Sequence, residues 1–149
     1  MGNQELLESY ITNAEAFAIA AHAIPSARLT HFPGEDEWTA AFVIHHMADS
    51  ELQFGVRYAN ILAEDIPDIV PFDEEKFPKG LHYAKRSVTN SILAFEAANK
   101  LNCEILGYIS PESWNRTSLH PVRGLMSLID LVTLSGNHIG EHISQLRKA

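Results

Sequence analysis

Apolar side chains recur along this chain at the three- and four-residue spacing that places them on one face of a helix. The spacing predicts four long helices. We expect the first over residues 6–21, with Asn3 as a candidate cap and Pro25 closing it, the second over 38–63, the third over 81–109, and the fourth from residues 121–124 to the C-terminus. No window of four or more residues alternates convincingly between apolar and polar side chains, so we expect no strands.

Each predicted helix can bury its apolar stripe only against the other helices. The 149 residues, 46% of them hydrophobic, suffice for a core, and no low-complexity linker divides them. We therefore expect an all-α fold in one domain over residues 1–149. The simplest arrangement is a four-helix bundle of up-down topology, with long connections between helices two and three and between helices three and four.

The connection Glu64–Gly80 is long for a bundle, and it mixes prolines, carboxylates and large apolar side chains. Long loops of this kind are either irregular arms packed over the fold or functional segments. Both interpretations stay open from the sequence: an arm over the end of the bundle, or one wall of a binding pocket. The other long connection, Pro111–Pro121, contains Trp114.

Composition excludes several classes of function. Eleven Lys and Arg stand against 19 Asp and Glu, and the net charge of −8 disfavours nucleic acid and anionic membranes as partners. The apolar run Ala16–Ala21 is too short for a membrane span and lacks the basic flank of a signal peptide. A single cysteine, Cys103, allows no internal disulfide and no cysteine-rich metal site. We expect a cytoplasmic protein whose metal ligands, if any, are nitrogen and oxygen atoms.

Histidines are the strongest chemical signal in the chain. His138 and His142 are four residues apart in the predicted fourth helix, so both can face one metal ion. A pair at this spacing is weak evidence alone in a chain with eight histidines. A third imidazole from a facing helix would complete the site.

His45 and His46 are adjacent in the second helix and must face different directions. His45 falls on the apolar stripe and is predicted to be a core histidine, whereas His46 falls on a polar stripe and is predicted to be the ligand. The apolar stripe consists of Trp38, Ala41, Ile44, Ala48, Leu52, Val56, Ala59 and Leu62. The polar stripe consists of His46 together with Thr39, Asp49, Ser50, Gln53 and Arg57.

Several segments together resemble the DinB/YfiT-like proteins of the damage-inducible protein superfamily. The segments are Glu37-Trp38-Thr39, His46-Met47-Ala48-Asp49-Ser50-Glu51 with Arg57 eleven residues after the histidine, Pro71–Phe77, His120–Gly124 and His138–Leu146. The order and spacing of these segments are more specific than any one of them. The resemblance implies a four-helix bundle with a divalent metal, often nickel or zinc, held by His46, His138 and His142.

The resemblance also suggests a class of reaction. Three imidazoles leave coordination positions open, as catalytic zinc requires. Relatives in the superfamily transfer or isomerise low-molecular-weight thiols, so we expect a metal-dependent transferase or hydrolase of a thiol or a related small molecule. The alternative is a non-catalytic stress-response protein, either a metal-binding module or a scaffold with a structural metal. Arg57, as a clamp for a substrate carboxylate, and Glu141, as a base, are the candidate catalytic residues.

Each of these two residues also has a simpler interpretation. Arg57 could instead pair with Asp49 or an acidic residue of the arm, and Glu141 could be exposed. His138-Ile139-Gly140-Glu141-His142 matches the H-x-x-E-H pattern of some metalloproteases, but seven residues after His142 leave no room for their downstream ligand. No Glu-x-x-His pair occurs on two helices, which excludes a ferritin-like di-iron site.

The first helix has a second apolar edge made of small residues and one isoleucine: Ala16, Ile19, Ala20 and Ala23. Small side chains permit the close approach of another helix. Two-fold pairing is the commonest oligomeric arrangement, and the family resemblance also favours it. We expect a homodimer in which helix one contributes to the interface.

Overall fold

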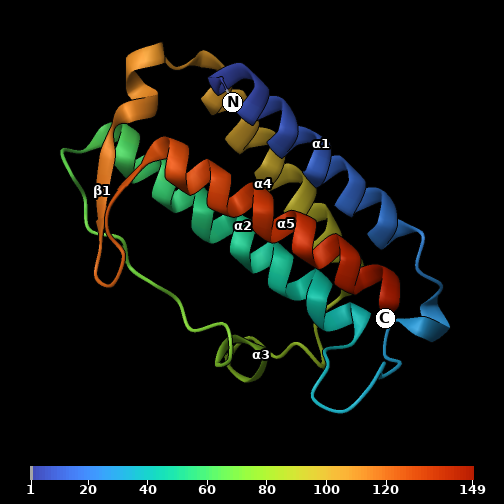
Figure 1. Cartoon of the computed structure of the whole chain (residues 1–149). Coiled ribbons are helices and arrows are strands. Elements are labelled where there is room, and N and C mark those ends of the chain that lie inside the picture. The colour runs from blue at the N-terminus through green and yellow to red at the C-terminus, as the bar shows by residue number, and fades with distance from the viewer. Residues whose placement is uncertain (1) are drawn as a thin grey trace.

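Four long helices pack side by side in the computed structural model, which describes residues 2–149 (Figure 1). They are α1 (Asn3–His22), α2 (Ala40–Ala63), α4 (Val88–Tyr108) and α5 (Leu128–Lys148). Shorter elements are η1 (Ser26–Arg28), α3 (Phe77–Gly80), η2 (Pro111–Asn115), β1 (Thr117–His120) and β2 (Gly124–Ser127). The predicted four-helix bundle is confirmed. No helix within residues 2–149 is both long enough and apolar enough to cross a membrane.

The helices do not alternate in direction, in contrast to the predicted up-down topology (Figure 1). α2 and α4 run parallel, because the connection between them carries the chain back along the whole bundle before α4 begins (Figure 1). The contacts follow this direction: His45 near the start of α2 meets Ser91 near the start of α4, and Glu51 further along α2 meets Asn99 and Asn102. α1 and α5 are likewise parallel, while α2 and α5 are antiparallel (Figure 1). The functional side chains of α2 and α5 therefore approach each other from opposite directions.

The centre of the bundle is mostly apolar, but it contains one buried carboxyl group with its hydrogen-bond partners. Buried apolar side chains from all four long helices make up the core, among them Tyr10, Phe17, Ile44, Met47, Phe95, Leu131 and Ile139. Glu51 is also buried, where its Oε1 accepts hydrogen bonds from Tyr10, Asn99 Nδ2 (3.1 Å) and Asn102 Nδ2 (3.0 Å). These donors from α1 and α4 satisfy the buried carboxyl group and join three helices.

The inward face of α2 differs from the predicted stripe in its second half. Leu52 and Val56 are half exposed, at 50% and 56%, whereas Phe54, Tyr58 and Ile61 are buried. The predicted stripe is therefore wrong from Leu52 to Ala59, whereas Leu62 packs against the core as predicted. The stripe departs from the structure there because Glu51, which the stripe leaves out, points into the bundle and is satisfied by hydrogen bonds.

Two predicted helix starts are too early. α4 begins at Val88 rather than near Leu81, because Ser87 caps it by accepting a hydrogen bond from the Asn90 amide (3.1 Å) and because His82 has a left-handed φ of 53°. α5 begins at Leu128, where Ser127 and Asp130 form a capping box. α1 begins at Asn3, with Gly2 in the cap position, so Asn3 is not the cap.

The expectation of no strands is also wrong. β1 and β2 form an antiparallel hairpin, with Ser118 opposite Met126 and His120 opposite Gly124. Gly124 adopts a φ of 77°, which glycine tolerates best. Each strand has four residues, which is too short for alternation to be recognised in the sequence.

The segment from Glu64 to Arg86, here called the arm, is held at both ends. Near its start, the Ile69 amide donates to Leu119 O (2.8 Å) and the Leu119 amide donates to Pro67 O (2.9 Å), so the arm joins β1. Near its end, Arg86 is hydrogen-bonded to Asp49 of α2. The arm therefore runs from the hairpin along α2 with its middle part over the side of the bundle (Figure 1).

Candidate metal centre

Three imidazole rings converge between α2 and α5. His138 Nε2 lies 3.0 Å from His46 Nε2 and 2.9 Å from His142 Nε2. One nitrogen of each of the three residues lies within 4.8 Å of the others. His46 is buried, and His138 and His142 are half-buried. Helical spacing brings His138 and His142 together on one face of α5. His46 joins them because α2 packs antiparallel against α5.

Hydrogen bonds at Nδ1 of His142 and His138 determine which ring nitrogen of these two residues carries a lone pair. Gln145 Oε1 lies 2.6 Å from His142 Nδ1, and since an amide oxygen only accepts, His142 donates through Nδ1. Ser50 Oγ lies 3.3 Å from His138 Nδ1 and can accept in the same way. The neutral ring then has its lone pair on Nε2, pointing toward the other imidazoles.

Burial keeps these rings neutral. Desolvation, followed by the neighbouring imidazoles, lowers the pKa of His46 to about 3, and desolvation and then His142 lower the pKa of His138 to about 4. Burial also lowers the pKa of His142, although the hydrogen bond to Gln145 acts in the opposite direction and raises it. The neutral imidazole is the form that binds a metal, so no proton has to leave at neutral pH.

The donor set fits a divalent metal. Lone pairs directed at one another at 2.9 and 3.0 Å repel unless a cation lies between them. Zinc–nitrogen bonds of about 2.0–2.1 Å in tetrahedral geometry separate ligand nitrogens by roughly 3.3 Å, close to these distances. Three nitrogen ligands would leave one position open, as in catalytic zinc sites rather than structural ones.

The arm supplies a carboxylate beside the cluster. Glu74 Oε2 lies 3.6 Å from His46 Nε2, and the Glu74 side chain is 57% exposed, so this side of the cluster opens to solvent. Asp73 Oδ1 accepts a hydrogen bond from the Glu75 amide (3.0 Å), and this turn presents Glu74. The Trp38 ring lies 5.1 Å from the His46 ring. In the sequence, Glu74 is one of several carboxylates in this connection, and nothing distinguishes it from the others.

The sequence profile of the DinB superfamily matches residues 10–146 of this chain. The chain belongs to the DinB superfamily. A candidate metal-dependent hydrolase of Oceanobacillus iheyensis is 33% identical over 114 residues, as are similarly named proteins of Bacillus cereus and Bacillus anthracis. These matches cover 74% of this chain but 66%, 65% and 65% of the three relatives, so the chain spans just under two thirds of their length.

A solved DinB-like structure shares the fold. YfiT from Bacillus subtilis, described as a probable metal-dependent hydrolase with an unusual four-helix bundle topology, superposes with a TM-score of 0.88. The match covers 97% of this chain and 83% of YfiT at 19% identity. At this identity the likeness establishes the fold alone. Together, the histidine cluster and the hydrolase names of the relatives indicate a divalent metal.

His45 faces away from the cluster of this DinB protein, as its place on the apolar stripe predicted. It is buried, its Nδ1 lies 2.7 Å from Ser91 Oγ, and its ring packs 5.3 Å from the Tyr83 ring. Burial, followed by the charge of Arg86, lowers its pKa to about 4. His45 therefore belongs to the contact between α2, α4 and the end of the arm.

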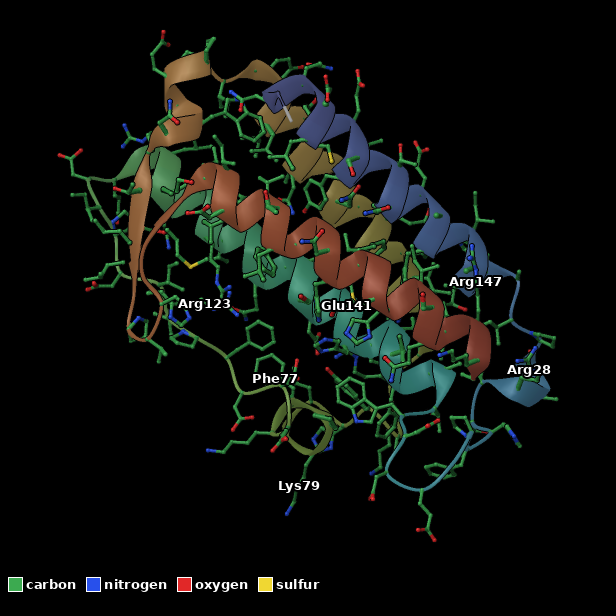
Figure 2. The ribbon with its side chains drawn as sticks, in the orientation of Figure 1. Arg28, Phe77, Lys79, Arg123, Glu141 and Arg147 are labelled. Atoms are coloured by element: carbon green, nitrogen blue, oxygen red, sulfur yellow. The ribbon has the colours of Figure 1, made fainter. Side chains whose placement is uncertain are left out.

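The two predicted catalytic candidates have different surroundings. Glu141 is exposed on α5 (Figure 2). Glu74 is the carboxylate that reaches the cluster. Arg57 does not pair with Asp49, because Arg86 occupies that carboxylate at 2.9 Å. Its guanidinium instead lies over the rings of Phe54 and Phe72, at 5.0 and 5.9 Å.

Proposed function

We propose that this protein is a metal-dependent hydrolase or transferase of a small molecule, with His46, His138 and His142 as the metal ligands. The observation that supports the proposal most strongly is the convergence of the Nε2 atoms of three imidazole rings at one place whose remaining side opens beside Glu74. A site with three protein ligands and solvent access suits catalysis, whereas a structural site needs a fourth protein ligand.

A divalent metal held there would polarise a bound oxygen or sulfur and lower the pKa of a bound water or thiol toward neutrality. Residues of the protein would orient the metal ligands and accept a proton. Gln145 and Ser50 hold His142 and His138 in the tautomer that presents Nε2. Glu74, within 3.6 Å of His46 Nε2, would accept the proton of a water or thiol placed at the open side of the cluster.

The proposal also concerns the identity of the metal and of the substrate. Nitrogen ligands suit nickel and zinc, and a soft thiolate binds either metal well. We therefore favour a low-molecular-weight thiol, or a small molecule derived from one, as the substrate. The competing function is a non-catalytic stress-response module or scaffold, in which the metal would only stabilise the bundle.

Cobalt substitution separates these functions. The visible spectrum of a cobalt-loaded sample should change when azide or a panel of cellular thiols is added, because an open position exchanges its ligand. A cobalt spectrum that stays unchanged with every added ligand would remove the mechanism and favour a structural metal.

Glu74→Gln tests the role of the arm, with Glu75→Gln as the matched control on the same exposed turn. Glu74→Gln should keep the bound metal and the spectral response to azide, yet lose hydrolysis of any ester, amide or thioester that the wild type cleaves. Glu75→Gln should behave as the wild type. Equal loss in both variants would assign the effect to the charge of the arm rather than to Glu74.

We also propose that the protein is a cytoplasmic homodimer. The predicted edge of α1 is consistent with pairing, because Ile19 is 72% exposed and lines, together with Ala16, Ala20 and Ala23, a cavity of about 470 Å³ between α1 and α5. A second copy could cover these apolar side chains by two-fold symmetry.

A further inference from the structure

The middle of the arm lies beside the histidine cluster without belonging to the core. From Val70 to His82 no residue is buried, whereas the flanking residues Ile69 and Tyr83 are only 6% and 2% exposed. Among residues 2–149, no hydrogen bond joins this stretch to α1, α2, α4 or α5, and its hydrogen bonds stay within the arm. We call residues 70–82 the lid. A stretch that is fixed at both ends and unburied between them can open locally while the rest of the fold stays intact.

The centre of the lid is a turn that is closed on itself. The ring of Phe72 packs 5.0 Å from the ring of Phe77, and the Lys76 amide donates a hydrogen bond to Asp73 O (3.0 Å). Phe77 faces the bundle, and Lys79 points away from it (Figure 2). The lid therefore has an inner and an outer side, and its parts move together when it is displaced.

One side chain of α2 connects the lid to the core. The guanidinium of Arg57 lies 5.0 Å from the ring centre of Phe54, a core residue, and 5.9 Å from that of Phe72 in the lid. Within residues 2–149, Arg57 forms no ion pair within 4.0 Å, and its buried Nε has no hydrogen-bond partner. The two aromatic rings are therefore the contacts that define the position of the guanidinium. A planar guanidinium is suited to this place because it can lie against aromatic faces.

The lid meets the candidate metal centre at Glu74. This residue follows Phe72 by two positions, and its Oε2 lies 3.6 Å from His46 Nε2. His46 itself is only 1% exposed. Two residues of extended chain span at most about 7 Å, so Phe72 cannot move far from Arg57 without moving Glu74. Displacement of the lid would therefore uncover this side of the histidine cluster.

We propose that Arg57 is a positioning residue, which latches the lid through Phe72 and so holds Glu74 beside the histidine cluster. That the open lid admits a small molecule to a reactive metal rests on the proposed function. A cation–π contact shifts the equilibrium between the closed and the open lid by a factor of roughly two to thirty. A latch of this strength favours the closed lid and still lets it open during turnover.

Opening of the lid can be measured in the metal-free protein with diethyl pyrocarbonate, which modifies neutral imidazoles. Mass spectrometry with fragmentation locates the modified histidines. Arg57→Met and Phe72→Ala should each raise the rate of modification at His46 by roughly two- to thirtyfold, because each removes the latch. The rate at His45, which is equally buried but faces Ser91 and Tyr83, should stay at the wild-type value and reports on unfolding of the whole chain.

The matched control is Tyr108→Ala, which removes an exposed aromatic side chain at the end of α4 and should change neither rate. The double variant Arg57→Met/Phe72→Ala should react at His46 no faster than the faster single variant, since both substitutions remove the same contact.

The outcomes separate the latch from the proposed function. Faster modification of His46 alone, with no further gain in the double variant, supports the latch even if no catalysis is found, because the measurement needs neither metal nor substrate. Wild-type rates at His46 in both single variants, rate increases that multiply in the double variant, or an equal increase at His45 would each overturn it. A cobalt spectrum without ligand exchange would remove the proposed function and leave these rates as they are.

Discussion

The end of the arm is fastened to α2 by one buried ion pair, and removing it should measurably destabilise the fold. Arg86 Nη1 donates to both oxygens of Asp49 at 2.9 Å, and Tyr83 OH donates to Asp49 Oδ2 at 2.6 Å. Arg86 Nη2 also donates to Ser91 Oγ at 3.0 Å. Arg86→Met would leave the Asp49 carboxylate, whose side chain is only 8% exposed, with Tyr83 as its remaining partner.

The magnitude follows from burial. Breaking a fully buried pair by removing one partner costs about 3–5 kcal/mol. The Arg86 side chain is 25% exposed and Tyr83 stays bonded, so we expect about 2–3 kcal/mol. For a chain of this size, that loss lowers Tm by roughly 5–10 °C.

Thermal unfolding followed by circular dichroism tests this prediction, with Lys85→Met as the matched control. Lys85 is exposed on the same turn, so its replacement should change stability by less than about 0.5 kcal/mol. Adding Asp49→Leu to Arg86→Met should restore part of the loss, since no charge is then left buried. If the Tm of Arg86→Met matched that of Lys85→Met, the pair would not fasten the arm.

Three further outcomes are expected. Gln145→Leu should weaken metal binding by about 10–100-fold in competition with a chromogenic chelator, because His142 loses the acceptor that orients it, and an unchanged affinity would contradict this role. In the metal-stripped protein, burial lowers the pKa of His46 to about 3 from an ordinary 6.5, so the unfolded chain binds more protons between these values. The Tm of that protein should therefore fall as the pH drops from about 7 to about 5, and a rise in Tm would refute the neutral state of the buried imidazoles. Light scattering should give roughly twice the 16.6 kDa of one chain, and Ile19→Glu should return the mass to that of a monomer; a monomeric wild type would contradict the dimer.

Helical periodicity predicted most of the fold because the four stripes are long enough to average over single exceptions. α2 shows the limit of the method. Periodicity places Leu52 and Val56 on its buried face, whereas the structure buries Glu51 there, because Tyr10, Asn99 and Asn102 lie close enough to satisfy its carboxyl group. Hydrogen-bond partners from other helices are set by tertiary structure and cannot be seen in one helix.

The three histidines of the candidate site could be chosen from the sequence because spacing places His138 and His142 on one face and separates His46 from His45. Glu74 could not be chosen, since its approach to His46 depends on the path of an irregular arm. The hairpin after η2 was missed because each of its strands has only four residues.

The most direct test of the proposed metal centre is the metal content of the purified protein and of four single variants, measured by elemental analysis. The wild type should hold roughly one divalent ion per chain. His46→Ala, His138→Ala and His142→Ala should each lose most of it while keeping their helix content. His45→Ala should keep the metal and unfold at a lower temperature, because it opens space beside Tyr83. Loss of metal from His45→Ala with retention in His46→Ala would contradict the assignment.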